Sequence, residues 1–305
     1  MSVAAKIARR PRAKSPPSGS STHFMPEDPL GRGTAGEIAP PPRLEFRDDS
    51  AGIFLYRAEC LEFLDRIFAK HPEGVFDTIF ADPPYFLSNG GITCQNGRMV
   101  RVDKGGWDKS RGSELNHEFN LEWLRRCQRV LRPNGTIWVT GTQHVIFSVG
   151  HAMQQLGMKL LNSITWEKPN PPPNLSCRYF THSTETVLWA AKNEKSRHVF
   201  NYALMREHGG GKQMKSVWRM KAPPKSEKHH GKHPTQKPLV LIERCLLAST
   251  NEGSLVLDPF SGSGTTAAAC ARIRRHCVAV EQDPAYLEIA RARVSEVLGQ
   301  HNLIP

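Results

Sequence analysis

Short apolar segments of strand length alternate with amphipathic segments of helix length from about residue 45 onward, and this alternation restricts the fold. Residues 53–56 and 75–81 are apolar runs typical of buried strands, and residues 60–69 between them carry apolar side chains at helical spacing. A strand, helix, strand order favours a parallel sheet, because parallel neighbours need a crossover connection. The chain is therefore predicted to be an α/β protein with a mostly parallel, doubly wound sheet.

The alternation continues to the end of the 305-residue chain, apart from a turn at Pro133-Asn134-Gly135 and a basic segment after residue 195. The further predicted helices cover residues 121–131, 143–156, 238–249, 264–274 and 285–298. The further predicted strands cover residues 136–140, 159–166, 186–191, 254–257 and 277–280. No internal repeat is evident, so a repeat array is not expected.

The charge balance points to a polyanionic partner. The chain has 41 Lys and Arg against 29 Asp and Glu, a formal net charge of +12, and nucleic acid is the leading candidate for such a surplus. No apolar run reaches the roughly 18 residues that a membrane span needs, and the seven cysteines are scattered without a CxxC pair. We expect reduced thiols in a soluble, cytoplasmic protein without a membrane partner.

Residues 1–44 are rich in Pro, Ser, Gly and Arg, with five basic residues before the first acidic one, Glu27. Such a segment cannot bury enough apolar surface to offset the entropy lost on ordering, so it is predicted to be a disordered basic tail. The alternatives are an electrostatic DNA tether and an organellar transit peptide. Pro11, Pro16 and Pro17 disfavour the transit peptide, because they interrupt a long amphipathic helix.

A second basic segment separates two α/β halves. Residues 195–237 contain eleven Lys or Arg, only two acidic residues and five His. A charge run is usually a solvated insertion, but this one concentrates most of the net charge between two halves of a predicted fold. His229, His230 and His233 have no cysteine at finger spacing, so no metal is expected and solvated or phosphate-facing imidazoles are preferred.

One motif points to a nucleotide-like cofactor. In residues 256–266 (VLDPFSGSGTT) an apolar strand runs into a small-residue loop that opens a helix, and Gly262 and Gly264 let the backbone approach a ligand closely. No Gly-Lys-Ser/Thr follows, so the loop is not a phosphate-binding P-loop. Glu281 ends the next strand, where a carboxylate can bind the two hydroxyls of a ribose. Together these features indicate an adenosine-containing cofactor.

A second motif is Asp82-Pro83-Pro84-Tyr85, directly after an apolar strand. The prolines fix φ and donate no N–H, so carbonyl oxygens remain available as acceptors. A rigid set of acceptors beside an aromatic ring suits a planar base that carries an amino group. Standing alone, the tetrapeptide has a stiff turn as its alternative interpretation. Its place at a strand end, together with the later glycine loop, makes it more specific.

With both motifs in view, the chain resembles the AdoMet-dependent DNA amino-methyltransferases of bacteria and phages. The motif order over residues 53–298 resembles the circularly permuted β class, whose fold is Rossmann-like. The segment from Leu87 to Asp108 is similar to an extension in an adenine-specific subgroup. The resemblance divides the chain into a tail (1–44), a catalytic half (45–194), a target-recognition insertion (195–232) and an AdoMet-binding half (233–305).

The resemblance also implies site residues. The catalytic set would be Asp82, Pro83, Pro84 and Tyr85, with base flipping, and Tyr85, helped by Phe86, would stack on the base. The residues implied to bind S-adenosyl-L-methionine (AdoMet) are Asp258, Phe260, Ser261, Gly262, Gly264, Thr265, Glu281, Thr235, Lys237 and Glu59. In this set, Thr235 and Lys237 would meet the methionine carboxylate. Glu59 would contact the adenine, in a position where many members have Asp.

The predicted function is site-specific methylation of adenine N6 in DNA, in a restriction-modification setting. Cytosine-N4 methylation is the runner-up, and a non-catalytic nucleic-acid-binding protein or an RNA methyltransferase are further alternatives. A cognate restriction endonuclease and a homodimer are implied as partners. The residues expected to contact DNA, helped by a glycine-rich loop at 89–112, are Arg197, Arg206, Lys212, Lys215, Arg219 and Lys221.

Overall fold

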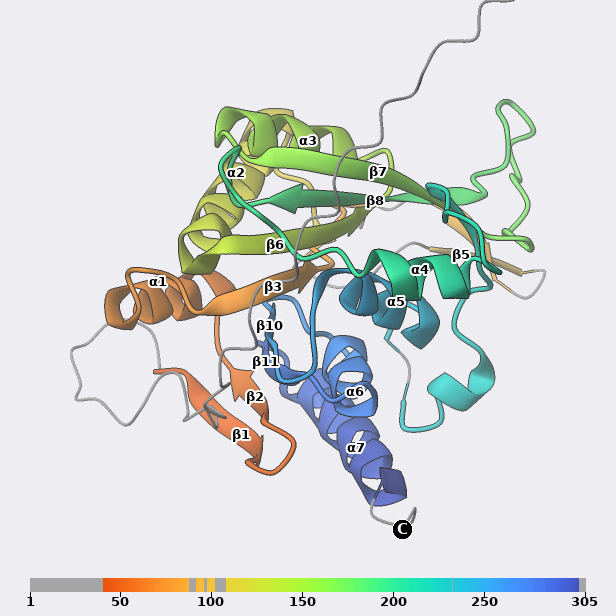
Figure 1. Cartoon of the computed structure of the whole chain (residues 1–305). Helices are drawn as coiled ribbons and strands as arrows, with labels where there is room; N and C mark the ends of the chain where they lie inside the picture. The colour runs from red at the N-terminus through yellow and green to blue at the C-terminus, as the bar shows by residue number, and fades with distance from the viewer. Residues whose placement is uncertain (1–40, 88–91, 96–97, 102–107, 232, 302–305) are drawn as a thin grey trace, which may run out of the picture.

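A computed structural model of the chain describes residues 41–87, 92–95, 98–101, 108–231 and 233–301. Nine strands form one sheet in the order β1-β2-β11-β10-β3-β6-β8-β7-β9, and β4 pairs with β5 in a separate hairpin (Figure 1). The strands are β1 (Arg43–Asp48), β2 (Ile53–Arg57), β3 (Phe76–Ala81), β4 (Ile92–Gln95), β5 (Arg98–Arg101), β6 (Leu131–Gly141), β7 (Lys159–Glu167), β8 (Thr184–Ala191), β9 (Val217–Arg219), β10 (Leu255–Asp258) and β11 (His276–Glu281).

Helices cover both faces of the sheet. They are α1 (Cys60–Lys70), α2 (Ser113–Val130), α3 (Ile146–Gln155), α4 (Tyr202–His208), α5 (Leu239–Ser249), α6 (Thr265–Arg272) and α7 (Pro284–His301), with a short 3-10 turn η2 (Lys225–Glu227). Buried residues of α1, α2 and α3 share one apolar cluster, whereas those of α4 to α7 belong to the cluster on the opposite face. The predicted doubly wound α/β fold is confirmed.

The centre of the sheet is parallel, since β2, β11, β10, β3 and β6 run the same way. The two strands β10 and β11, late in the chain, are inserted between β2 and β3, which are early and joined by α1. The carboxyl ends of β2, β3, β10 and β11 therefore lie along one edge. Ligands of open α/β sheets bind at such an edge, where strand order changes direction.

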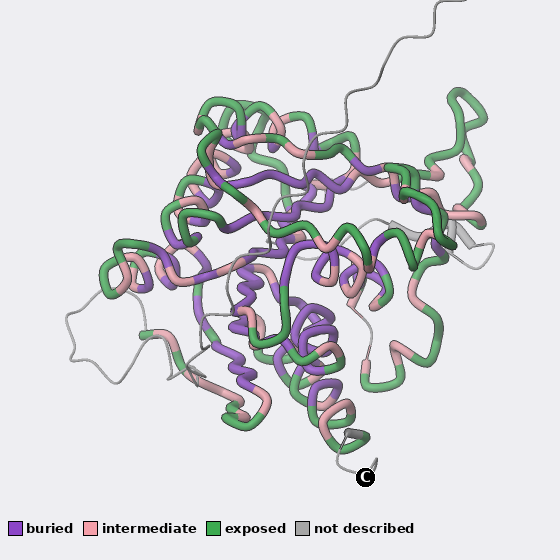
Figure 2. Tube along the Cα trace, in the orientation of Figure 1, coloured by how far each residue is buried: buried purple, intermediate pink, exposed green. Residues whose placement is uncertain are grey.

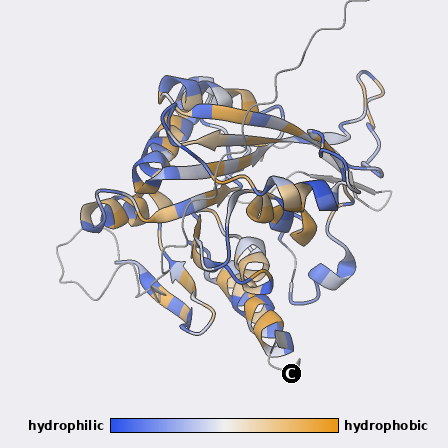
Figure 3. Cartoon of the chain, in the orientation of Figure 1, coloured by the Kyte–Doolittle hydropathy of each residue, from blue (hydrophilic) through white to orange (hydrophobic). Residues whose placement is uncertain are grey.

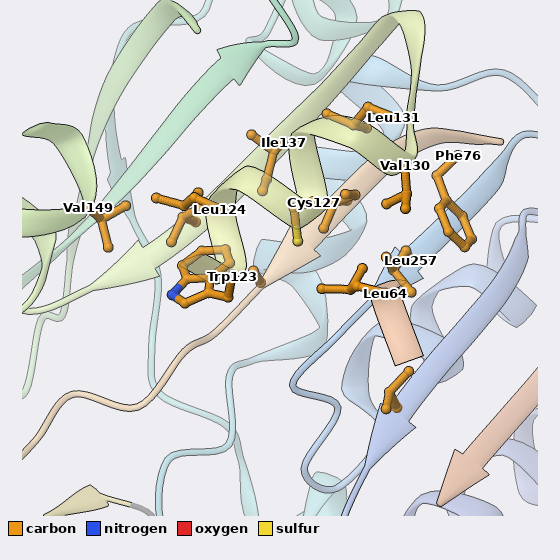
Figure 4. Packing of buried hydrophobic residues seen from close by; sticks show 14 of the residues in the cluster. Leu64, Phe76, Trp123, Leu124, Cys127, Val130, Leu131, Ile137, Val149 and Leu257 are labelled. Carbon is orange, nitrogen blue, oxygen red and sulfur yellow. The ribbon is translucent and has the colours of Figure 1, made fainter. Parts of the chain in front are cut away.

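The core between α2 and the sheet is built from large apolar side chains. Trp123, Leu124 and Cys127 of α2 face Ile137 of β6 and Leu257 of β10 (Figure 4), and all five are fully buried. Figure 2 shows the central strands buried along most of their length, with exposure concentrated on the outer helix faces and loops. This packing fixes the strand ends that carry both motifs. None of the helices in the described ranges is long and apolar enough to cross a membrane.

The basic segment after residue 195 is joined to the core. Met205, Trp218 and Met220 are buried in the same cluster as α5, and β9 pairs with the outer strand β7 in parallel. The Trp218 ring lies 6.4 Å from the ring of Trp138 in β6. The basic segment itself is hydrophilic around η2 (Figure 3). Most charged side chains of the segment are therefore exposed, while its buried apolar residues pack on the core. The charge pattern alone did not predict this packing.

Several elements differ from the sequence-based predictions. The helix predicted at 121–131 begins at Ser113, because its polar first turns bind α3: His117 and Asn120 both contact Ser148 Oγ. The predicted turn at 133–135 lies within β6, where Ser196 Oγ donates to Pro133 O. The edge strand β1 was not predicted, and it begins inside the segment predicted as tail.

A glycine-rich loop was predicted at 89–112, but its described residues include the β4–β5 hairpin. The predicted tail up to residue 40 lies outside the described residues, as do Asn89, Gly90, Gly91, Lys104 and Trp107. The cysteines whose side chains are described are all free, as predicted.

The buried position of Trp218 leads to a stability prediction. We expect Trp218→Ala to lower the free energy of unfolding by about 3–5 kcal/mol, because it leaves a cavity between β9 and α5. The neighbouring Val217 is 61% exposed, so Val217→Ala serves as control and should change stability by at most about 0.5 kcal/mol. Urea denaturation followed by tryptophan fluorescence measures both. Equal stabilities for the two variants would show that the basic segment unfolds separately from the core.

Candidate active site

A pocket of about 440 Å³ opens at the carboxyl edge of the central strands. Its volume lies in the range of small-molecule sites. It brings together motifs that are far apart in the sequence. The predicted site residues that line it are Glu59, Asp82, Pro84, Thr235, Lys237, Asp258, Phe260, Ser261, Gly262, Thr265 and Glu281. Pro83, Tyr85 and Gly264 are not among the lining residues.

The glycine loop between β10 and α6 has the backbone that the motif predicts. Gly262 and Gly264 have φ of +50° and +73°, in the left-handed region that favours glycine. A Cβ on Gly262 would meet the His233 ring at 3.0 Å, and one on Gly264 would meet Ala290 Cβ at 2.5 Å. Ser261 Oγ is buried with no hydrogen-bond partner in the described part of the chain. A close cradle with an unsatisfied hydroxyl fits a ligand that brings its own polar groups.

Glu281 closes this loop from the end of β11. Its carboxylate accepts N–H bonds from Gly262 at 2.8 Å and from Gln282 and Asp283 at 2.9 Å each. Burial raises the pKa of Glu281, although these three N–H groups oppose the shift. Three of about four acceptor positions on a carboxylate are thus used within the chain, and the bond from Gly262 ties the glycine loop to the end of β11.

Asp258, at the end of β10, is almost completely buried. Its carboxyl accepts the N–H of Phe260 at 3.0 Å. Burial raises the pKa of Asp258 to about 7. This carboxyl therefore gains and loses its proton around neutral pH.

Asp82 also lines the pocket and receives three donors. Tyr85 Oη donates to Oδ1 at 2.7 Å and Thr140 Oγ1 to the same oxygen at 2.5 Å. Lys237 Nζ donates to Oδ2 at 2.6 Å. A carboxylate offers about four acceptor positions, so the donors among the described residues leave one of them, on Oδ2, for a further N–H.

Behind Asp82 lies a buried charge network that the motifs did not predict. Glu185 of β8 pairs with Lys168, and its Oε2 lies 3.7 Å from Lys237 Nζ and 3.2 Å from Tyr85 Oη. Burial opposes ionisation of Glu185, but Lys237 and Lys168 outweigh it, so the pKa of Glu185 is lowered. Burial likewise opposes the charge on Lys237, and Asp82 with Glu185 nevertheless raise its pKa. The only sequence signal for Glu185 was an acid at the start of an apolar strand.

Tyr85 was predicted to stack on a base, but its ring is only 4% exposed in the structure. Burial, then the charges of Asp82 and Glu185, raise the pKa of Tyr85 well above its ordinary value. The phenol therefore stays protonated and donates to Asp82. The stacking role stays a prediction, and the structure places the hydroxyl as an orienting group.

The loop that carries the Asp-Pro-Pro-Tyr motif is held by a fully buried carboxylate, Asp108. Its two oxygens accept the N–H groups of Tyr85 at 2.9 Å and of Leu87 at 3.1 Å. Phe86 between them has φ of 57°, a strained value for a bulky residue. Asp108 thus holds a turn that the local sequence does not favour.

Three further predicted cofactor residues, Glu59, Thr235 and Lys237, line the same pocket. Glu59 caps α1 by accepting the N–H of Glu62 at 2.9 Å, and Thr235 Oγ1 lies 3.3 Å from His233 Nδ1. Lys237 pairs with Asp82 and Glu185 within the chain, and its predicted contact with the methionine carboxylate stays a prediction. His233 also contacts the Tyr286 ring at 4.4 Å, so it belongs to this pocket.

The chain has relatives over most of its length. The family model described as DNA methylase, which covers N6 and N4 enzymes, matches residues 76–292. The Type II methyltransferase M2.DpnII of Streptococcus pneumoniae is 54% identical over 243 residues, covering 79% of this chain and 89% of that protein. The Type II methyltransferase M2.MboI of Moraxella bovis is 46% identical over 252 residues, 83% of this chain and 91% of that one.

The chain belongs to the DNA methylase family. Among solved structures, the M1.HpyAVI–SAM complex is 28% identical with a TM-score of 0.61 and covers 79% of this chain and 98% of that one. The PvuII cytosine-N4-specific methyltransferase, at 19% identity and a TM-score of 0.61 over 82% and 92% of the chains, shares the fold. This DNA methylase is therefore a site-specific DNA methyltransferase that uses AdoMet. The predicted enzyme class and the predicted cofactor are confirmed.

The basic residues of this DNA methylase that were predicted to contact DNA are all exposed: Arg197, Arg206, Lys212, Lys215, Arg219 and Lys221. Two of the three histidines, predicted as solvated or phosphate-facing rings, are partly exposed and also have a carboxylate partner. His229 and His230 both contact Glu296 Oε2 at 2.9 Å, because α7 passes beside their turn. The pair fastens residues 225–231 to α7.

The raised pKa of Asp258 predicts a pH dependence. The unfolded chain releases this proton near the ordinary pKa of 3.8, whereas the folded chain holds it to about 7. Between these values the folded state binds more protons than the unfolded state. As the pH rises through this range, the unfolding free energy of the parent should therefore fall relative to that of Asp258→Asn, by up to about 1.4 kcal/mol per pH unit. Above about pH 8 the difference should be constant. Urea denaturation from pH 5 to 9 measures it, and a pH-independent difference would contradict an Asp258 that keeps its proton.

Proposed function

We propose that this DNA methyltransferase modifies the N6 amino group of adenine. The observation that carries the proposal is the Asp82 carboxylate, oriented by Tyr85 and Thr140 with one acceptor position left on Oδ2. An exocyclic amino group has two N–H donors and needs two acceptors in its plane. Asp82 Oδ2 and the carbonyl oxygen of Pro83 supply them, since neither proline of the motif can donate an N–H.

AdoMet, when bound, supplies a methyl group on a sulfonium centre, and the residues proposed to hold it are those of the glycine loop, Glu281 and Thr235. The amino lone pair is delocalised into the base ring. Two acceptors on its N–H groups increase electron density at nitrogen and hold it in one orientation, and such positioning is the larger part of catalysis of this kind. The phenol of Tyr85 and the ammonium of Lys237 keep Asp82 in place while the base is methylated.

The target base cannot reach Asp82 while it is stacked inside a duplex, so it enters the pocket by flipping. Phe119 and Pro84 line the pocket beside Asp82 and offer apolar contacts to a planar ring. Cytosine N4 carries the same amino chemistry and is the alternative substrate. The aspartate that opens the motif and the resemblance of the segment from Leu87 to Asp108 to an adenine-specific subgroup favour adenine.

The setting is proposed from the relatives, which are named Type II methyltransferases. We infer a cytoplasmic modification enzyme with a cognate restriction endonuclease, and a homodimer as in the resembling class. The four-part division of the chain stays part of this proposal, with residues 195–232 as the target-recognition segment.

The reaction is tested by nucleoside mass spectrometry of DNA incubated with the protein and labelled AdoMet. We expect labelled N6-methyladenine from the parent, and a loss of at least about 1000-fold in rate for Asp82→Ala, which removes an acceptor of the reacting group. Asp65→Ala is the control, because Asp65 lies on α1 and pairs only with Arg126 among the described residues. AdoMet binding by calorimetry should persist in both variants.

The outcome for each alternative is distinct. Labelled N4-methylcytosine would replace the adenine assignment and keep the mechanism. Full turnover by Asp82→Ala would remove Asp82 from the reaction. AdoMet binding without any methylated base in DNA would leave an RNA substrate or a non-catalytic binder.

The proposed DNA contact of the basic segment is tested by the salt dependence of DNA binding. Lys212, Lys215 and Lys221 are exposed around β9, and replacing all three with Gln should flatten the slope of log K against log salt by up to about 0.9 per lost phosphate contact. A deletion is unsuitable, because it would remove the buried Trp218 and Met220. The control replaces Lys70, Arg125 and Arg291, which are exposed on α1, α2 and α7. Equal slopes in both triple variants would place the DNA elsewhere.

A further inference from the structure

The loop between β7 and β8, residues 169–182, leaves the sheet next to the catalytic network. Strand β7 runs parallel to β6, because both are antiparallel to β8. The loop therefore starts at the same edge as Asp82. Its base is closed by Lys168 N–H donating to Ser183 O at 2.8 Å. In Figure 1 it is the light green loop that projects beyond the sheet on the right.

The base of this loop also contacts the site through charge. Lys168 pairs with Glu185, whose Oε2 is 3.2 Å from the hydroxyl of Tyr85. The two residues that flank the loop are thus part of the network that orients Asp82. The loop therefore leaves the sheet from residues that belong to the site.

The tip of the loop is preorganised. Pro171, Pro172 and Pro173 stiffen the outgoing arm. Asn174 then closes a turn: its Oδ1 accepts the N–H of Ser176 at 3.0 Å, and its Nδ2 donates to Tyr179 O at 2.6 Å.

This turn presents an apolar and a cationic group to solvent. Phe180 is 96% exposed and Tyr179 is 60% exposed, and Arg178 beside them is exposed as well. Residues 178–180 are here named the aromatic tip. A rigid, exposed phenylalanine gains nothing from burial within the chain, whereas an aromatic ring with an adjacent arginine suits stacking on nucleic-acid bases and contact with a phosphate.

We propose that the aromatic tip stacks on DNA bases beside the target base, with Phe180 as the main contact. The inference rests on the proposed function, in which a DNA base enters the pocket at Asp82. The bases that Phe180 meets come either from the gap that flipping leaves in a duplex or from an unpaired strand. The tip holds the neighbouring bases while Asp82 binds the flipped one.

The experiment compares Phe180→Ala with Phe147→Ala. Phe147 is 76% exposed on α3 and lies outside residues 169–182, so it matches the lost surface. DNA affinity is measured by fluorescence anisotropy, and turnover by methyl transfer, on one sequence in single-stranded and duplex form. We expect Phe180→Ala to weaken binding and raise KM by about 5- to 150-fold, the range for loss of one stacked base, with kcat at saturation and AdoMet affinity unchanged.

The comparison of single-stranded with duplex DNA identifies which bases Phe180 contacts. A loss on the duplex alone assigns Phe180 to the gap left by flipping, and a loss on both forms assigns it to bases of the strand itself. Unchanged affinity and KM on both forms, equal to Phe147→Ala, would overturn the proposal. Because anisotropy reads binding without turnover, a failure of the adenine assignment would appear in the parent's methylated product and leave the Phe180 comparison intact.

Discussion

A buried ammonium group holds the site together. Lys237 pairs with Asp82, which follows β3, and with Glu185 of β8, and these two residues are 155 and 52 positions away from it in the chain. Removing three charges from water is unfavourable unless each finds partners, and here Lys168, Tyr85 and Thr140 complete the set. The catalytic loop, the segment before α5 and the start of β8 must therefore meet in one arrangement. The pocket between the two motifs follows from that arrangement.

The chemistry of the site is divided between two kinds of structure. The glycine loop is shaped by backbone freedom, and Glu281 fastens it by accepting the N–H of Gly262. The catalytic loop is instead forced into shape, since Asp108 holds the N–H groups on both sides of a left-handed Phe86. A permissive loop can adapt to a cofactor that comes and goes, whereas a strained loop keeps an acceptor fixed in direction.

Both motifs could be predicted from the sequence because their chemistry is local: Asp82 follows an apolar strand, and Gly262 and Gly264 stand where a strand opens a helix. Thr140 and Glu185 could not be predicted, since they reach Asp82 and Tyr85 across 58 and 100 positions and belong to no short pattern. The packing of Trp218 under the basic segment could not be predicted either, because the charge pattern of that segment indicates only an exposed insertion. The edge strand β1 was missed because its pattern is weak and its partner β2 supplies the pairing.

The placing of β10 and β11 between β2 and β3 has a consequence for biosynthesis. When β2 and β3 have left the ribosome, the two strands that belong between them are still unmade, and Leu255 N–H meets Asp77 only across 178 positions. The nascent chain therefore carries two unpaired strand edges through most of translation, a state prone to wrong pairing. Completion of the sheet waits for the last part of the chain, so this enzyme acquires its cofactor loop and its central sheet in the same late step.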